Sequence, residues 1–184
     1  MLQQPLFYIN PLYYDSPVSN YYTDSSVYYD KCCGGFIEWN GGRISRIKIA
    51  NINSSDINYG ELVGIEMALN DISNNFNPTI RYVVNTDSQS SLLAISSDED
   101  NRLEVENIRR ILSNHPNIRL RKVKSHVDPI MQKKIQKTNG ENITLTEARH
   151  ICDGNKKIDE IVRGHAMNDS KVMNHNRVPF KIKV

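Results

Sequence analysis

Residues 20–50 read NYYTDSSVYYDKCCGGFIEWNGGRISRIKIA and contain three segments typical of β-strands. Residues 21–29 are rich in Tyr, Val and Thr, residues 33–39 form a second segment entered through the Gly-Gly pair at 34–35, and residues 43–50 alternate apolar and polar side chains. An Asn-Gly-Gly turn at residues 40–42 separates the last two segments and favours a tight hairpin. The stretch therefore predicts three consecutive antiparallel strands.

After these strands, helical and strand patterns alternate. Four segments with apolar stripes predict helices: one beginning near Asn58, residues 88–95, residues 103–112, and a last one from Asn155. Residues 80–84 and 118–123 predict two further strands. Between the last strand and the last helix, residues 131–137 fit a short basic helix, and Thr144–Glu147 has the spacing of a capping box for another. The order predicts an α/β fold with a five-stranded mixed sheet, three antiparallel strands followed by two more, flanked by helices.

The length of 184 residues fits one domain with additional terminal segments. Residues 1–19 show no regular period and predict an irregular N-terminal arm. We place the domain at residues 20–168, with an insert at about 128–152, and a basic C-terminal tail at 169–184.

The composition is that of a soluble globular protein, with 39% hydrophobic and 24% charged residues and a net charge of +2. The chain has no apolar run near the roughly 18–20 residues that cross a membrane. It starts without the basic segment of a secretory signal, so we expect a protein that is not secreted. Three cysteines are too few for a disulfide framework, which favours the cytoplasm or another reducing compartment.

Four acidic residues occupy positions where a functional site is expected. Asp24 lies inside the first strand, Glu61 opens the first helix, Asp87 ends the fourth strand, and Asp159 lies on the last helix. Strand interiors seldom contain Asp, and a buried carboxylate is costly unless its charge is compensated. If the four converge, a hard divalent cation such as Mg²⁺ or Mn²⁺ removes their repulsion. Two such ions about 3.5–4 Å apart are suited to phosphodiester hydrolysis.

Five short motifs around these residues resemble the type 1 ribonuclease H family. Y-T-D-S-S at 22–26 is similar to the family's Y-T-D-G-S, and N-Y-G-E-L at 58–62 to N-R-A-E-L. T-D-S-Q at 86–89 matches outright, and V-K-S-H at 123–126 resembles V-K-G-H. G-N-K-K-I-D-E at 154–160 resembles G-N-E-R-x-D-E. The resemblance extends over most of the chain, from about residue 20 to 168, and implies a ribonuclease H-like fold.

The resemblance also implies roles for individual residues. Asp24, Glu61, Asp87 and Asp159 would hold two Mg²⁺ ions, with Mn²⁺ as a substitute, and His126 would assist proton transfer or product release. Asn58 and Gln89 would read the 2′-hydroxyls of an RNA–DNA hybrid through their amides, although helix-start roles fit both residues as well. The full set of expected substrate-binding residues is Ser25, Ser26, Asn58, Gln89, Lys124, Asn155 and Lys156.

The chain departs from the family pattern in four places. Ser25 replaces a glycine, Asp56 stands near where the family has threonines, and residues 96–100 are acidic where some members have a basic handle. His126 and Asp159 are 33 residues apart, about three times the family's spacing. The insert that separates them contains basic residues and fits either a lid over the site or a solvated excursion; these residues are Lys133, Lys134, Lys137 and Arg149.

The sequence thus predicts a Mg²⁺-dependent endoribonuclease that cleaves the RNA strand of RNA–DNA hybrids and leaves 5′-phosphate and 3′-hydroxyl ends. Two alternatives stay open: a non-catalytic binding module of the same fold, and another nuclease of that fold, of the resolvase or strand-transfer type. We expect a monomer with no membrane association, and the N-terminal arm is a candidate site for a protein partner.

Overall fold

Two tight turns fold the first three strands into an antiparallel meander. In the computed structural model, which describes residues 17–172 and side chains as far as residue 168, these strands are β1 (Val18–Tyr28), β2 (Lys31–Asn40) and β3 (Arg43–Ile52). The second turn contains Gly41 and Gly42 with φ of 60° and 87°, a conformation that glycine adopts without strain. The predicted Asn-Gly-Gly hairpin is confirmed.

Two parallel strands complete the sheet on the other side of β1. β4 (Arg81–Thr86) pairs with β1, and β5 (Ile118–Lys122) pairs with β4, giving the order β3-β2-β1-β4-β5. The predicted five-stranded mixed sheet is therefore confirmed. Because β1 is central and parallel to β4, the polar residues at the end of β4 come to lie beside the middle of β1.

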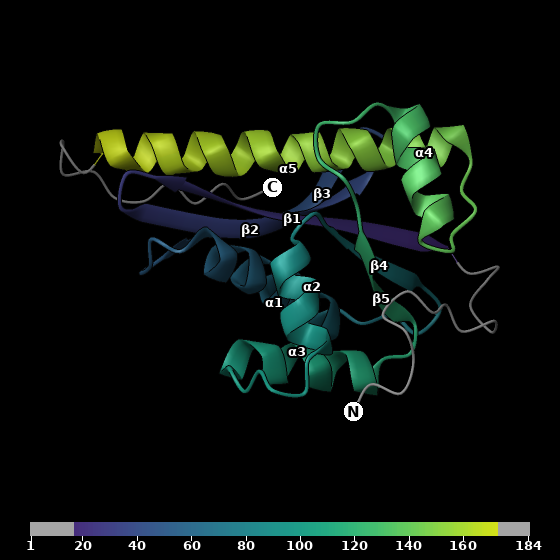
Figure 1. Ribbon diagram of the computed structural model, residues 1–184, viewed down its shortest axis with the longest axis horizontal. Helices are drawn as coiled ribbons and strands as arrows, with labels where there is room; N and C mark the ends of the chain where they lie inside the picture. The colour runs from purple at the N-terminus through teal and green to yellow at the C-terminus, as the bar shows by residue number, and fades with distance from the viewer. Residues whose placement is uncertain (1–16, 173–184) are drawn as a thin grey trace.

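Helices cover both faces of the sheet (Figure 1). α1 (Ile57–Asn74), α2 (Gln89–Ser96) and α3 (Leu103–Asn114) lie on one face, and the long α5 (Leu145–Val172) crosses the other. The short α4 (Pro129–Thr138) packs against the N-terminal part of α5. Within residues 17–172, no helix combines the length and apolar character that crossing a membrane requires.

Each face has its own apolar core. The core under α1–α3 is the larger one and contains Tyr21, Phe36, Leu69, Val84 and Leu120. The core under α5 contains Tyr22, Ile37, Ile158 and Val162. The adjacent residues Tyr21 and Tyr22 belong to different cores because side chains of a strand alternate between its faces.

The sequence predicted one helix starting at the capping box and a separate one starting at Asn155. The structure corrects this prediction, because a single helix, α5, covers both. The capping box is present, since the Thr144 N–H donates to Glu147 Oε2 at 2.7 Å and the Glu147 N–H donates to Thr144 Oγ1 at 3.1 Å. The helix that it starts nevertheless continues through Gly154 to Val172. A Cβ on Gly154 would lie 2.4 Å from the Tyr22 ring, so this glycine permits close packing of α5 on β1 and does not end a helix.

The start of β1 and the end of α5 also differ from the expected limits of the domain. β1 begins at Val18, inside the predicted arm, because Val18 pairs with Arg81 of β4. α5 extends to Val172, so the first residues of the predicted tail are helical. The rest of the arm and tail, residues 1–16 and 173–184, lies outside the described part of the chain.

Candidate active site

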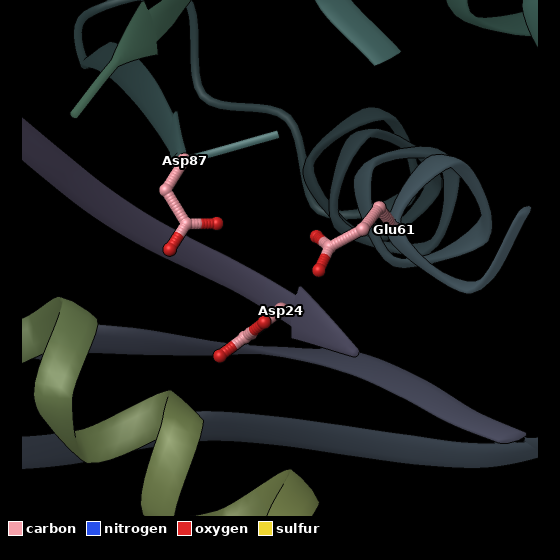
Figure 2. Close-up of side chains that lie close together, drawn as sticks. All are labelled: Asp24, Glu61 and Asp87. Atoms are coloured by element: carbon pink, nitrogen blue, oxygen red, sulfur yellow. The ribbon is translucent and has the colours of Figure 1, made fainter. Parts of the chain in front are cut away.

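Three of the four predicted carboxylates come together at the centre of the sheet. Asp24 comes from the middle of β1, Glu61 from the first turns of α1, and Asp87 directly follows β4. One carboxylate oxygen from each residue lies within 4.8 Å of the others, and the three side chains point toward one another (Figure 2). These oxygens therefore form a candidate site for a hard cation.

Glycines allow α1 to bring Glu61 to this position. A Cβ on Gly60 would lie 2.5 Å from Cys32 Sγ and 2.9 Å from Ser25 Cβ. A Cβ on Gly34 of β2 would lie 2.5 Å from the Gly60 carbonyl oxygen. The helix can therefore approach the sheet closely only because both positions lack a side chain.

Ser25, which stands in place of the family's glycine, connects the elements of the site. Its Oγ is 3.0 Å from Glu61 Oε1 and 3.0 Å from the carbonyl oxygen of Ile57, and its backbone N–H donates to Asp24 Oδ1 at 2.7 Å. The Ser25 side chain is buried. It therefore orients two of the carboxylates, a role not evident from the sequence, which suggested a substrate contact.

The electrostatics of the cluster favour a bound cation. Burial raises the pKa of Asp24, and the charge of Asp87 raises it further. Burial also raises the pKa of Glu61, with Asp24 and Asp87 adding to the effect. Glu61 Oε2 is buried without a hydrogen-bond partner among the described residues. Crowded, desolvated carboxylates with a free oxygen fit Mg²⁺ or Mn²⁺, which take all-oxygen ligands and would neutralise the repulsion.

Asp159 is close to the cluster without joining it. Its carboxylate accepts two hydrogen bonds from Arg163 Nη2, at 2.7 and 2.9 Å, one turn further along α5. Among the described residues, the group of carboxylates within 4.8 Å does not include it. Its charge still contributes to the raised pKa of Asp24, so it lies near enough to interact with the site.

His126 lies in the exposed loop between β5 and α4, with φ of 56°. Two buried glutamines of α4 fix the strand end that leads into this loop. Gln132 exchanges hydrogen bonds with the backbone N–H and C=O of Lys124, and Gln136 donates to the Lys122 carbonyl oxygen at 2.9 Å. They are only 0% and 1% exposed. Their burial is not evident from the sequence, because a polar residue on a basic helix ordinarily faces solvent.

The expected hybrid-binding residues have mixed surroundings. One interpretation of the sequence made Asn58 the N-cap of α1. In the structure Asp56 is the N-cap, and it accepts a hydrogen bond from the Asn58 N–H. The Asn58 amide oxygen instead accepts from Ser90 Oγ at 3.1 Å, which links α1 to α2 beside the exposed Gln89. The other expected residues are the half-buried Ser26, the exposed Lys124 and Lys156, and the buried Asn155.

The insert is a docked part of the domain. α4 is held to β5 by the two glutamines and packs on α5, while the side chains of Lys133, Lys134 and Lys137 are exposed. Arg149 is exposed on the first part of α5. Contact between these cations and a nucleic acid stays a prediction.

Comparison with known proteins identifies the fold. Neither a protein-family model nor a curated protein sequence matches the chain. Among solved structures, the chain is similar to RNase H1 from the halophilic archaeon Halobacterium salinarum NRC-1, with 15% identity and a TM-score of 0.52. That match covers 83% of this chain and 98% of the archaeal one.

Two further structures match with lower TM-scores. The N-terminal RNase H domain of rv2228c from Mycobacterium tuberculosis has 14% identity and a TM-score of 0.47, covering 58% of this chain and 87% of that one. LC11-RNase H1, solved in complex with an RNA/DNA hybrid, has 16% identity and a TM-score of 0.45, covering 57% of this chain and 84% of that one. The strand order and the match to the archaeal enzyme agree with the resemblance of the motifs: the chain has the fold of the type 1 ribonucleases H.

Proposed function

We propose that the protein is a type 1 ribonuclease H, an endoribonuclease that hydrolyses the RNA strand of RNA–DNA hybrids and leaves 5′-phosphate and 3′-hydroxyl ends. The observation that supports this most directly is the convergence of Asp24, Glu61 and Asp87 within 4.8 Å on a sheet of this fold. The family motifs surround the same three residues, which favours this activity over that of another nuclease.

The carboxylates of Asp24, Glu61 and Asp87 would hold the divalent cations, and Asp159 is the proposed fourth ligand. When bound, two such ions supply the Lewis acidity that activates water and stabilises the departing oxygen in phosphodiester hydrolysis. Ser25 keeps Glu61 in place through its hydroxyl. Asp159 would have to exchange its hydrogen bonds to Arg163 for a place in the cluster.

The remaining predicted residues would bind and process the hybrid. His126, exposed on its loop, is positioned to exchange protons with solvent, and an imidazole can serve as either an acid or a base in such a role. Gln89 is exposed at the start of α2, directly after the Asp87 segment, where an amide is available to a 2′-hydroxyl. Lys124 and Lys156 are exposed and available to phosphates.

The test measures cleavage of end-labelled RNA–DNA hybrid, double-stranded RNA and branched DNA, each with Mg²⁺ or with EDTA. We expect Mg²⁺-dependent cleavage of the RNA strand of the hybrid alone. Asp87→Asn should abolish cleavage, because it removes a ligand charge from the cluster. Asp98→Asn is the matched control, since Asp98 is an exposed carboxylate between α2 and α3, and it should retain wild-type activity.

Other outcomes would assign the alternatives. Hybrid binding without cleavage in Mg²⁺ or Mn²⁺ would identify a non-catalytic binding module. Cleavage of branched DNA in preference to hybrid would identify a resolvase-type nuclease. Hybrid cleavage that persists in Asp87→Asn would contradict the proposed metal site.

A further inference from the structure

The structure contains a cavity of about 500 Å³ on the α5 face of the sheet, away from the carboxylate cluster. Its floor is formed by β1, β4 and β5, and its roof by the α4–α5 connection and the start of α5. Three arginines line it: Arg81 of β4, and Arg119 and Arg121 of β5. Their strand neighbours Tyr82, Val84 and Leu120 face the opposite core, so strand alternation places all three arginines on the cavity side.

Positive charge exceeds negative charge in this arginine pocket. Arg119 and Arg121 are 5% and 8% exposed, and both pair with the same carboxylate, that of Glu141. Arg121 donates to it at 2.9 and 3.1 Å. Glu147 also lines the pocket, but its carboxylate accepts the N–H of Thr144 in the capping box. Two buried guanidinium groups and the nearby Arg81 are therefore balanced by one carboxylate, that of Glu141, and both of its oxygens already accept hydrogen bonds from arginines.

The pocket also contains unused hydrogen-bond donors. Nε and Nη1 of Arg119, Nε of Arg81 and Nδ2 of Asn139 are buried without a partner in the described part of the chain. Buried polar groups in folded proteins are nearly always paired, so a cluster of unpaired ones requires an explanation. All four atoms are N–H donors, and the ligand that would satisfy them must present acceptors.

The lowered pKa of Arg119 also indicates an excess of positive charge in the pocket. Burial and the neighbouring charge of Arg121 lower its pKa to about 10, even though Glu141 acts to raise it. An added negative charge would reverse this shift. Glu141, in turn, has a lowered pKa because the two arginines outweigh the effect of its own burial.

We propose that the arginine pocket binds a phosphate monoester. Guanidinium groups present rigid, paired donors that match phosphate oxygens, and donors from three residues suit a tetrahedral oxyanion better than a planar carboxylate. The volume is in the range of pockets that enclose small organic ligands, so the phosphate can carry a group such as a nucleoside. This proposal does not depend on the nuclease activity, because no residue of the carboxylate cluster lines the pocket.

Calorimetric titration of the full chain in EDTA tests the proposal. The probes are inorganic phosphate, adenosine monophosphate, adenosine, acetate, and a short DNA strand with and without a 5′-phosphate. We expect one site that binds phosphate and the monophosphate but not adenosine or acetate. If the phosphorylated strand binds more tightly than the monophosphate, the phosphate that the pocket binds belongs to a strand end. If the monophosphate binds more tightly, it belongs to a free nucleotide.

Arg81→Gln and Arg119→Gln should each weaken phosphate binding at least about tenfold, since each removes charge-assisted donors. Arg110→Gln removes one charge from an exposed position of α3 and should leave binding unchanged. Asp87→Asn should also leave it unchanged, which separates this site from the proposed active site. If Arg119→Gln does not fold, the phosphate binding of Arg81→Gln tests the proposal, because Arg81 is only half-buried and its replacement should not prevent folding. The proposal is overturned if no phosphate probe binds, if acetate binds as tightly as phosphate, or if Arg81→Gln binds like the wild type.

Discussion

The carboxylate of Asp159 is paired with Arg163, one turn later on α5, through two hydrogen bonds of 2.7 and 2.9 Å. Asp159 is at the same time close enough to Asp24 to raise its pKa. The arginine therefore competes with any cation that would recruit Asp159 as the fourth ligand of the cluster.

Arg163→Gln should lower the Mg²⁺ concentration at half-maximal hybrid cleavage, because it releases Asp159. The cost in stability should be small, about 0.3–0.5 kcal/mol, since exposed pairs one turn apart contribute little. The measurement is a Mg²⁺ titration of the cleavage rate. Arg110→Gln, at an exposed position of α3, is the control. A midpoint in Arg163→Gln that is unchanged or higher, with Arg110→Gln like the wild type, would contradict competition.

The metal-free protein should lose stability as the pH rises. Asp24 and Glu61 have raised pKa values in the folded state, so they contribute stability that is complete below their ordinary values of 3.8 and 4.5 and is lost as the pH rises through the folded values. Thermal unfolding in EDTA from pH 4 upward should show this decline. Glu61→Gln should reduce the slope, and Mg²⁺ should restore stability at high pH to the wild type but not to the variant. A slope that is equal in both proteins would count against the raised pKa of Glu61.

Gly60→Ala should destabilise the protein by about 1–3 kcal/mol, the usual cost of overpacking. The added Cβ would lie 2.5 Å from Cys32 Sγ and 2.9 Å from Ser25 Cβ, so α1 must move and carry Glu61 with it. We expect a lower melting temperature and weaker Mg²⁺ binding.

Gly164→Ala on α5 is the matched control for this change. A Cβ there meets nothing within 4 Å, and alanine is a better helix former by about 0.8–1 kcal/mol, so this variant should be more stable than the wild type. Equal effects of the two substitutions would show that close packing of α1 does not position Glu61.

Gln132→Ala should loosen the loop that contains His126. The substitution removes both hydrogen bonds between Gln132 and the backbone of Lys124, at an expected cost of about 1–3 kcal/mol. Hydrogen exchange of the backbone amides of residues 124–127 should accelerate, and the cleavage rate should fall. Ile130→Ala changes an exposed side chain of the same helix and should do neither. Unchanged exchange in Gln132→Ala would argue against this anchoring role.

The order and type of most elements followed from local patterns in the sequence. The three-strand meander and the capping box at Thr144 depend on residues that are near one another in the chain, and both are present. The motifs pointed to four carboxylates, and three of them, Asp24, Glu61 and Asp87, converge, because each stands at a defined point of a strand or helix.

Other features depend on contacts between distant segments, and no local pattern contains them. The last helix was expected to begin at Asn155, yet α5 runs through Gly154, which packs on Tyr22 of β1, a residue far away in the sequence. The burial of Gln132, and of the arginines that line the pocket, follows from the docking of α4 and α5 on the sheet. The pairing of Asp159 with Arg163 instead of the cluster was likewise decided by the folded structure. Sequence determined which chemical groups are available and on which elements they stand, whereas tertiary packing decided which of them lose water, because desolvation depends on every segment that covers a side chain.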